Sequence, residues 1–385
     1  MESKFGLFYS ILFLYIFSCN AYGQTNALDT VPVKDNLKKN WNGFNLIDNK
    51  ENSIIQRVSI VGRYHGQYWN VNAKQGNAEG WDNRRFFGGV EVVFFQHFTA
   101  HVQINIGEDF NPLYNAIYQA YLKWTPNKTY TLTLGRVDFL YAGLERTVSS
   151  NKILTFERSL ISNQLWPGEV LGAIIQGKLG DVTYHTGLLA GAKADDISES
   201  DYKRGFGLVV GVGLKANLFY EKGSIHLDYL YNNGKSTING FEPYNHSFSL
   251  WHQGQIGRFS MGTELSAANG IDGNKSVMGI TLLPSYVVAK DLLSKGDALE
   301  GVLRYQYARS DGNNGLSLQS RYEQEVVSNG SGNSYQALYA GINYLIINNH
   351  LKVMTGVEYS AMKGDALAQN SFNGFTYLAG IRIYF

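Results

Sequence analysis

The sequence has little cysteine and little proline, and beyond residue 24 it has no long apolar run. Cys19 is the only cysteine among 385 residues, so a mature chain that begins after it has no disulfide. Only 6 prolines interrupt the chain, which leaves room for many uninterrupted strands. Because no later stretch approaches the roughly 20 apolar residues of a membrane-spanning helix, this chain can cross a membrane only with strands. The net charge of +1 gives no support for a nucleic-acid partner.

The one strongly apolar stretch lies near the N-terminus. Residues 5–18 read FGLFYSILFLYIFS, follow a lysine and precede small residues that offer a cleavage site before Gln24. This order is typical of a secretory signal peptide, and we predict that residues 1–23 form one. The alternative is a lipoprotein signal that ends at Cys19. Phe17 disfavours it, because that position usually holds a small or β-branched residue.

Alternating apolar and polar residues dominate the rest of the chain. The last segment, FTYLAGIRIYF, has apolar side chains at every second position and ends on Phe385. Neighbours along a strand face opposite sides, so such a segment suits a wall with lipid outside and water inside. We count sixteen candidate strands near 54–70, 82–98, 99–108, 114–125, 129–138, 168–179, 182–192, 205–218, 224–232, 244–253, 257–267, 277–290, 298–310, 334–347, 350–361 and 375–385.

The links between these candidate strands alternate in length. After even strands they are short, as at 126–128 and 180–181; after odd strands they are longer and richer in Gly, Asn, Asp and Ser, as at 311–333. Short turns on the periplasmic rim and long outer loops are typical of outer-membrane barrels. A soluble β-sandwich has no such asymmetry and rarely has sixteen strands.

The sequence therefore predicts an all-β fold, a transmembrane antiparallel β-barrel of about 16 strands over residues 54–385. Residues 24–53 would be a periplasmic lead-in, and both termini would lie in the periplasm of a Gram-negative cell. A barrel of this width leaves an aqueous channel, so a conduit is the expected function. Tyr377 and Phe385 are the expected assembly signal, presented to the barrel assembly machinery before the last strand pairs with the first. Outer-membrane lipids would surround the wall.

The link at 139–167, the third loop, is the longest one between candidate strands. It carries apolar residues that a water-exposed loop would not need: Leu140, Leu144, Val148, Ile153, Leu154, Phe156, Leu160, Ile161, Leu165 and Trp166. We predict that this loop folds inward, fixes those groups to the wall and narrows the pore.

Two stretches resemble the phosphate-selective porin family of Gram-negative outer membranes, the O and P type. One is NGFNLIDNKENSIIQRVSIVGRYHGQY at 42–68; the other is LTLGRVDF leading into GLERTVSSNKILTFERS at 143–159. The resemblance implies a sixteen-stranded barrel, a homotrimer, a constriction at the third loop and phosphate or other small anions as permeant solutes. This chain departs from the family after Gly135, where Arg136 stands in place of the usual Lys-Pro step. The resemblance alone therefore leaves the anion preference open.

Charged residues give two sets of candidates for the pore. The predicted constriction consists of Arg136, Glu145, Arg146, Lys152, Glu157 and Arg158. The predicted pore wall carries Arg57, Arg63, Arg85, Lys123, Arg304 and Arg382. Cations in a confined, partly dehydrated neck are weakly screened and would favour anions. In the alternative interpretation, Glu145 pairs with Arg146 and Glu157 with Arg158, and these pairs only hold the loop down.

Three rival functions differ from an anion-preferring porin. An outer-membrane hydrolase would need a catalytic constellation, and His246-Ser247 has no recognisable partner at motif spacing, so we predict no enzyme. The motifs indicate no cofactor, no structural zinc and no EF-hand, while DGNN at 311–314 leaves a calcium site open. A channel for sugars or peptides would need an aromatic ladder along the lumen, where small and charged residues dominate. A surface receptor or adhesin barrel would use the long outer loops and leaves no mark that the sequence reveals.

Overall fold

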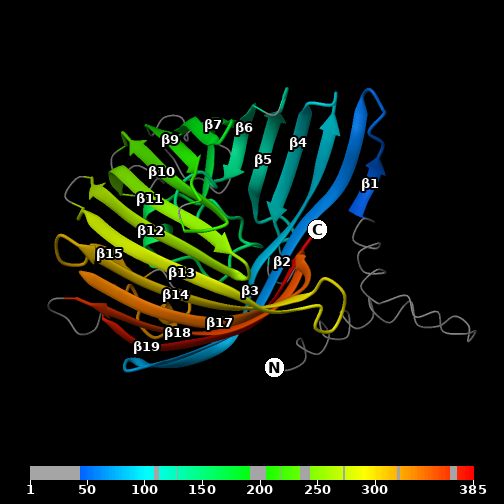
Figure 1. The fold of residues 1–385 in the computed structure, drawn as a ribbon. Coiled ribbons are helices and arrows are strands. Elements are labelled where there is room, and N and C mark those ends of the chain that lie inside the picture. The colour runs from blue at the N-terminus through cyan, green and yellow to red at the C-terminus, as the bar shows by residue number, and fades with distance from the viewer. Residues whose placement is uncertain are drawn as a thin grey trace, which may run out of the picture.

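The computed structural model describes residues 44–107, 112–127, 129–190, 205–217, 219–234, 243–271, 274–318, 321–364 and 371–385. The predicted signal peptide at 1–23 and most of the lead-in at 24–53 lie outside these ranges. The described part is one large antiparallel sheet that curls into a barrel, together with a separate two-stranded sheet of β15 (Leu316–Ser317) and β16 (Ser331–Gly332) (Figure 1).

Sixteen strands close the barrel, and a short seventeenth, β1 (Asn45–Asp48), adds to the edge of β2. The first eight barrel strands are β2 (Ile55–Ala73), β3 (Gly76–Phe94), β4 (Phe98–Asn105), β5 (Ala116–Trp124), β6 (Tyr130–Asp138), β7 (Glu169–Leu179), β8 (Val182–Ala190) and β9 (Phe206–Lys215). The other eight are β10 (Lys222–Asn232), β11 (Tyr244–Ile256), β12 (Phe259–Gly270), β13 (Val277–Lys290), β14 (Ala298–Ser310), β17 (Ser334–Asn349), β18 (Leu351–Lys363) and β19 (Phe372–Tyr384).

Each strand pairs with its neighbours in the sequence, and the last strand pairs with the first. The closing ladder between β19 and β2 runs from Gly374 opposite Ala73 to Tyr384 opposite Arg63. This closure leaves no long unpaired edge. The predicted antiparallel barrel of about sixteen strands is confirmed.

The two rims of the barrel differ in their links. We call the rim that holds Phe385 the turn rim; its links include 95–97, 180–181, 257–258 and His350. We call the opposite rim the loop rim; its links include 106–115, 139–168 and 311–333.

The predicted alternation of link lengths has two exceptions. The first link on the loop rim is only Lys74 and Gln75, because β2 and β3, each 19 residues long, are joined there as a tight hairpin. The link at 291–297 is the long one on the turn rim; the Asp297 carboxylate organises it by accepting hydrogen bonds from the backbone N–H groups of Leu292, Leu293 and Ser294.

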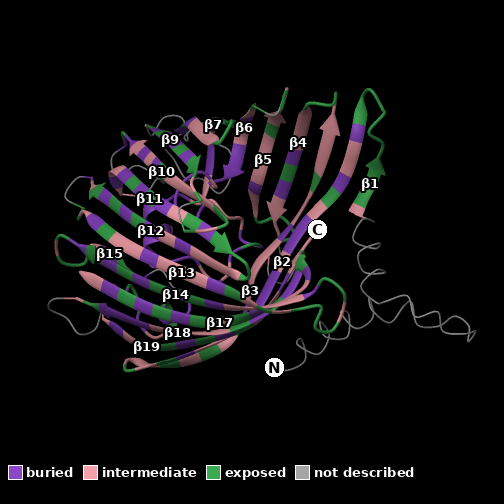
Figure 2. Ribbon diagram, viewed as in Figure 1, coloured by how far each residue is buried: buried purple, intermediate pink, exposed green. Residues whose placement is uncertain are grey.

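The burial pattern is the reverse of that in a water-soluble protein (Figure 2). Large apolar side chains are exposed on the outer wall, among them Val90, Leu122, Leu134, Leu188, Val210, Leu265, Leu303 and Ile342. Polar and charged side chains are buried inside, among them Arg63, Gln103, Asp228, Glu264, Thr281, Arg304, Lys352 and Arg382. A wall of this kind is stable only with lipid outside, so the alternative of a soluble sandwich is wrong.

In the described part of the chain, two short helices accompany the strands, α3 (Leu160–Leu165) in the third loop and η2 (Glu323–Glu325) in the link at 311–333. Among the described residues, no helix has the length and apolar character needed to cross a membrane.

Candidate pore constriction

The third loop lies against inward-facing side chains on widely separated strands. On one side of the barrel, the Asp228 carboxylate on β10 accepts a hydrogen bond from the Gly143 N–H at 2.8 Å, and Gln164 donates to the Tyr244 hydroxyl on β11 at 2.6 Å. On another side, the Leu160 N–H donates to the Gln306 side chain on β14 at 2.8 Å. These contacts place the loop across the barrel interior.

Cationic side chains of the wall bind the segment 145–153 of the third loop. Arg304 on β14 donates to the Glu145 carboxylate at 2.8 Å and to the Glu358 carboxylate on β18 at 2.7 Å. Arg382 on β19 donates to the Ser150 carbonyl at 2.9 Å, and Lys352 on β18 donates to the Ile153 carbonyl at 2.9 Å. Arg304 and Arg382, predicted as pore-wall cations, are therefore buried and hold the loop against the wall by hydrogen bonds. Lys352 was not among the predicted residues, although its alternation along β18 marks it as inward-facing.

Most apolar residues of the third loop are buried, as expected from the sequence. Leu144, Ile153, Phe156, Leu165 and Trp166 are all at most 4% exposed. Helix α3 begins at a Ser159 cap whose hydroxyl accepts a hydrogen bond from the Ser162 N–H. Leu160, Ile161 and Leu165 on this helix are buried. The loop is thus a packed element of the lumen.

Charged neighbours in the loop do not pair with each other. Glu145 pairs with Arg304, whereas Arg146 pairs with Asp138 at 3.3 Å and donates to the Pro167 carbonyl at 2.9 Å. Glu157 forms two bonds with Arg84 on β3, at 2.7 and 3.2 Å. Arg158 donates to the carbonyls of Glu145 and Val148. The interpretation in which each arginine pairs with its adjacent glutamate is wrong, because the partners come from the wall and from other turns of the loop.

A cavity of about 480 Å³ lies between the loop and strands β3 to β6, and arginine dominates its lining. Six arginines surround it, together with three acidic residues, Asp138, Glu157 and Glu169. The six are Arg84, Arg85, Arg136, Arg146, Arg158 and Arg321. Three of the constriction residues predicted from the sequence, Arg136, Arg146 and Arg158, thus meet around one space.

Two irregularities of the wall bring arginines into this cavity. Gly135 has φ of 128°, and the strand alternation breaks there: Leu134 is 44% exposed on the outer wall, while Arg136, two residues later, is 6% exposed. The register between β2 and β3 shifts between His65 and Gln67, which lets the adjacent Arg84 and Arg85 both line the cavity. Regular alternation places only one of two adjacent residues inside, and for this reason the sequence analysis included Arg85 but not Arg84.

The remaining predicted residues have separate positions. Arg57 pairs with Glu91 at 2.6 Å, and Lys123 lies 5.4 Å from the centre of the Tyr121 ring. Arg63 donates to the Ser150 hydroxyl at 2.6 Å and is a further tether of the loop. Lys152 is exposed. Tyr377 is exposed on the outer wall, and Phe385 ends the closing strand.

A second loop also packs inside the barrel, and the sequence analysis treated it only as an outer link. In the segment 311–333, Leu316, Leu318, Tyr322 and Val327 are buried. The Tyr322 ring stacks on Trp69, and its hydroxyl donates to Asp82 at 2.8 Å. The apolar residues of this segment were the available signal.

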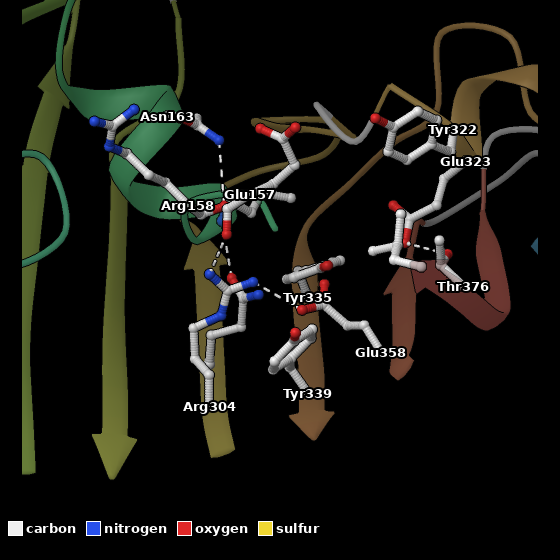
Figure 3. A pocket seen from close by; sticks show the side chains of 13 residues that line it. Glu157, Arg158, Asn163, Arg304, Tyr322, Glu323, Tyr335, Tyr339, Glu358 and Thr376 are labelled. Atoms are coloured by element: carbon white, nitrogen blue, oxygen red, sulfur yellow. Dashed lines mark hydrogen bonds and ion pairs between the residues drawn. The ribbon is translucent and has the colours of Figure 1, made fainter. Parts of the chain in front are cut away.

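The two loops meet over a small cavity of about 40 Å³ beside β14 and β17 to β19. Figure 3 shows Arg304 reaching from its strand to Glu358 and to the third loop at Glu157, with Tyr322 and Glu323 of the second loop at the other end. Glu157 and Arg158 line both this cavity and the arginine-rich one. They therefore form the partition between the two spaces.

Both partition residues are ionised at neutral pH. Burial disfavours the charged form of Glu157, but the charges of Arg84 and Arg85 outweigh it and lower the pKa of this carboxyl to about 2. Burial and the nearby charge of Arg146 lower the pKa of Arg158 to about 10. No group of three or more His, Cys, Asp or Glu side chains in the described ranges is arranged to hold a metal ion.

A closed barrel with an apolar outer wall, a charged lumen and an inserted loop is the architecture of an outer-membrane porin, which is a channel. Residues 58–206 match the model of the family described as phosphate-selective porin O and P. The predicted resemblance is confirmed over this range, which runs from β2 to the start of β9 and includes the whole third loop. No curated protein matches the chain in sequence.

Solved structures of outer-membrane channels share the fold. An anion-selective porin from Comamonas acidovorans aligns with a TM-score of 0.57 at 11% identity, covering 85% of this chain and 99% of that one. The outer-membrane channel DcaP of Acinetobacter baumannii aligns with a TM-score of 0.55 at 12% identity, covering 88% and 100%. OprB of Pseudomonas putida gives 0.55 at 10% identity, covering 85% and 94%. At these identities the likeness concerns the fold alone.

Proposed function

We propose that this porin conducts small anions, phosphate among them, through the space between the third loop and strands β3 to β6. The observation that carries the proposal is the arginine-rich cavity of about 480 Å³, where six arginines face three acids. Two of those acids are already paired, Asp138 with Arg146 and Glu157 with Arg84. The space therefore has a surplus of positive charge.

Confinement makes this surplus effective. A loop and a wall of low dielectric screen charges less than open water does, so each arginine raises the local concentration of anions and lowers that of cations. One terminal nitrogen of Arg85, Nη1, is buried and has no hydrogen-bond partner among the described residues. A passing anion would supply the acceptor that this nitrogen lacks. The family match on 58–206 and the anion-selective porin among the similar structures also support a preference for anions.

The placement in the envelope is part of the proposal. The turn rim would face the periplasm and the loop rim the exterior, as the difference in link lengths suggests. Residues 1–23 would be removed as a signal peptide, residues 24–53 would lead into the barrel, and residues 54–385 would form it. The homotrimer and the contact with the barrel assembly machinery are inferred from the family resemblance; electrophoresis of native detergent-solubilised protein tests the trimer.

Reversal potentials test the selectivity. In a planar bilayer under a KCl gradient, the protein should show chloride over potassium preference, and phosphate should compete with chloride. The double variant Arg85→Gln/Arg136→Gln should lower the anion-to-cation permeability ratio by roughly threefold or more, since two fixed charges leave a confined neck. Lys363→Gln is the matched control, because Lys363 is an exposed cation at the loop rim. A reversal potential of cationic sign in the unaltered protein would refute the proposal.

A further inference from the structure

A second, larger cavity lies on the other side of the third loop. It has a volume of about 590 Å³ and is bounded by the loop and by the turn-rim halves of β9 to β14. The arginine-rich cavity lies nearer the loop rim, between the outer ends of β4, β5 and β6. A solute that crosses the barrel therefore has two chemically different spaces available.

The loop side of the second cavity is aliphatic. Leu144, Val148, Ile153 and Leu154 line it, and Leu283 on β13 adds to the same apolar surface. Leu144 and Ile153 are fully packed, whereas Val148 and Leu154 are half-buried. Val148 and Leu154 therefore present apolar surface that the packing of the loop itself does not use.

The wall side carries neutral polar groups and two cations. Gln253, Ser260 and Ser285 represent the amides and hydroxyls of this wall. Lys215 and Lys222 lie where β9 ends and β10 begins, at the turn rim, and both are exposed. The acids on this cavity are Glu300 and Glu145, and Glu145 is already paired with Arg304 at 2.8 Å.

This arrangement matches an anion with an apolar tail better than it matches an inorganic anion. A carboxylate near Lys215 or Lys222 can keep its water and its charge partner while an attached hydrocarbon chain lies on Val148 and Leu154. Phosphate or chloride gains nothing from those side chains, because both ions are fully hydrated. Partial burial of each methylene group should strengthen binding by roughly twofold, about half the value for complete transfer out of water.

We propose that the second cavity is a subsite for small organic monoanions with short apolar groups, of the alkyl monocarboxylate class. The subsite depends on the proposed anion conduction, since the same solutes must pass the arginine-rich cavity. The subsite would make the channel discriminate between anions by the size of their apolar group as well as by their charge.

Block of chloride current measures binding at the subsite. Acetate, propionate, butyrate and hexanoate would be added on the turn-rim side of a bilayer that holds the full-length protein in KCl. The half-blocking concentration should fall by roughly twofold for each added methylene. Val148→Thr and Leu154→Asn should flatten this dependence, because each replaces apolar lining with a polar group. Leu140→Asn is the matched control, since Leu140 is a half-buried leucine of the same loop that does not line this cavity.

The outcomes separate this inference from the proposed function. A falling half-blocking concentration that flattens in the two cavity variants and persists in the control supports the subsite. Equal or rising values from acetate to hexanoate in the unaltered protein would overturn it, even if a variant fails to fold, and would leave an anionic reversal potential unaffected. A cationic reversal potential would refute both the proposed function and the subsite.

Discussion

The ring of Phe44 stacks on the ring of the terminal Phe385, with centroids 4.2 Å apart and planes at 20°. Phe385 also exchanges two backbone hydrogen bonds with Gly62 on β2, at 2.9 and 3.1 Å. Just past this point β1 takes over the edge of β2, with Asn45 opposite Ser59. The last residue of the chain is thus held between the first barrel strand and the segment that precedes it.

Changing Phe385 to Asp should impair outer-membrane assembly while export continues. The residue directly follows the closing strand, and its half-buried ring stacks on Phe44 and lies against Gly62, so a charged side chain loses both the aromatic contact and the apolar packing. Heat-modifiable, folded protein in outer-membrane fractions is the measurement. Phe44→Ala is the control for loss of the ring contact alone, and it should assemble with a stability loss of only about 1 kcal/mol. Normal yields of folded Phe385→Asp protein would contradict the assignment.

Gly62→Ala should weaken the closing seam. A Cβ atom at position 62 would lie 2.3 Å from the Phe385 ring, so the ring must move, at a cost of about 1–3 kcal/mol. Gly301→Ala is the matched control, because the nearest atom to a Cβ there lies 3.9 Å away, in the Val288 side chain. The temperature at which the barrel loses its folded electrophoretic mobility should fall for Gly62→Ala and stay unchanged for Gly301→Ala.

The sequence predicted the strands because alternation is local, and each of the sixteen candidates overlaps an observed strand. It could not predict which charges meet, because the partners are distant: Arg304 and Glu145 are 159 positions apart. The apolar residues of the third loop predicted that the loop is buried, but not which wall residues it packs against. The glycine before Arg136 and the bulge at Arg84 break the very period on which the inward-facing residues were chosen. These two irregularities bring arginines to the arginine-rich cavity. The alternation of inward- and outward-facing residues therefore fails as a predictor at the candidate site itself.

Arg304→Gln should loosen the third loop. The side chain is 2% exposed and binds Glu145 and Glu358, so its removal leaves the buried Glu145 carboxylate and the half-buried Glu358 carboxylate without their cation, at a cost of about 3 kcal/mol or more. We expect a larger and noisier single-channel conductance than in the unaltered protein. Arg309→Gln serves as the control, because Arg309 lies on the same strand and is exposed. An unchanged conductance in Arg304→Gln would show that the other tethers suffice to hold the loop.

The double variant Arg146→Gln/Arg158→Gln should change both selectivity and conductance. Each arginine lines the arginine-rich cavity, and each also donates to loop carbonyls, Arg146 to Pro167 and Arg158 to Val148. Loss of two charges lowers the anion-to-cation permeability ratio, and loss of the hydrogen bonds widens the neck. Reversal potential and single-channel conductance, measured on the same protein, separate the two effects. A change in conductance with no shift of reversal potential would mean that the arginines only hold the loop.

The contribution of Glu157 and Arg158 to selectivity should change with pH only at the alkaline end. Glu157, with a pKa of about 2, stays ionised at any higher pH, and Arg158, with a pKa of about 10, stays protonated at any lower pH. Between pH 5 and 8, which is about two pH units or more from either value, the contribution of these two residues to the anion-to-cation permeability ratio should therefore be constant. Above pH 10 the loss of the Arg158 charge should lower the ratio by roughly twofold. Lysines on the wall lose their charge in the same range, so the Arg158→Gln variant is measured in parallel. The alkaline step should be smaller in this variant, and an equal step in both proteins would assign the effect to the lysines instead.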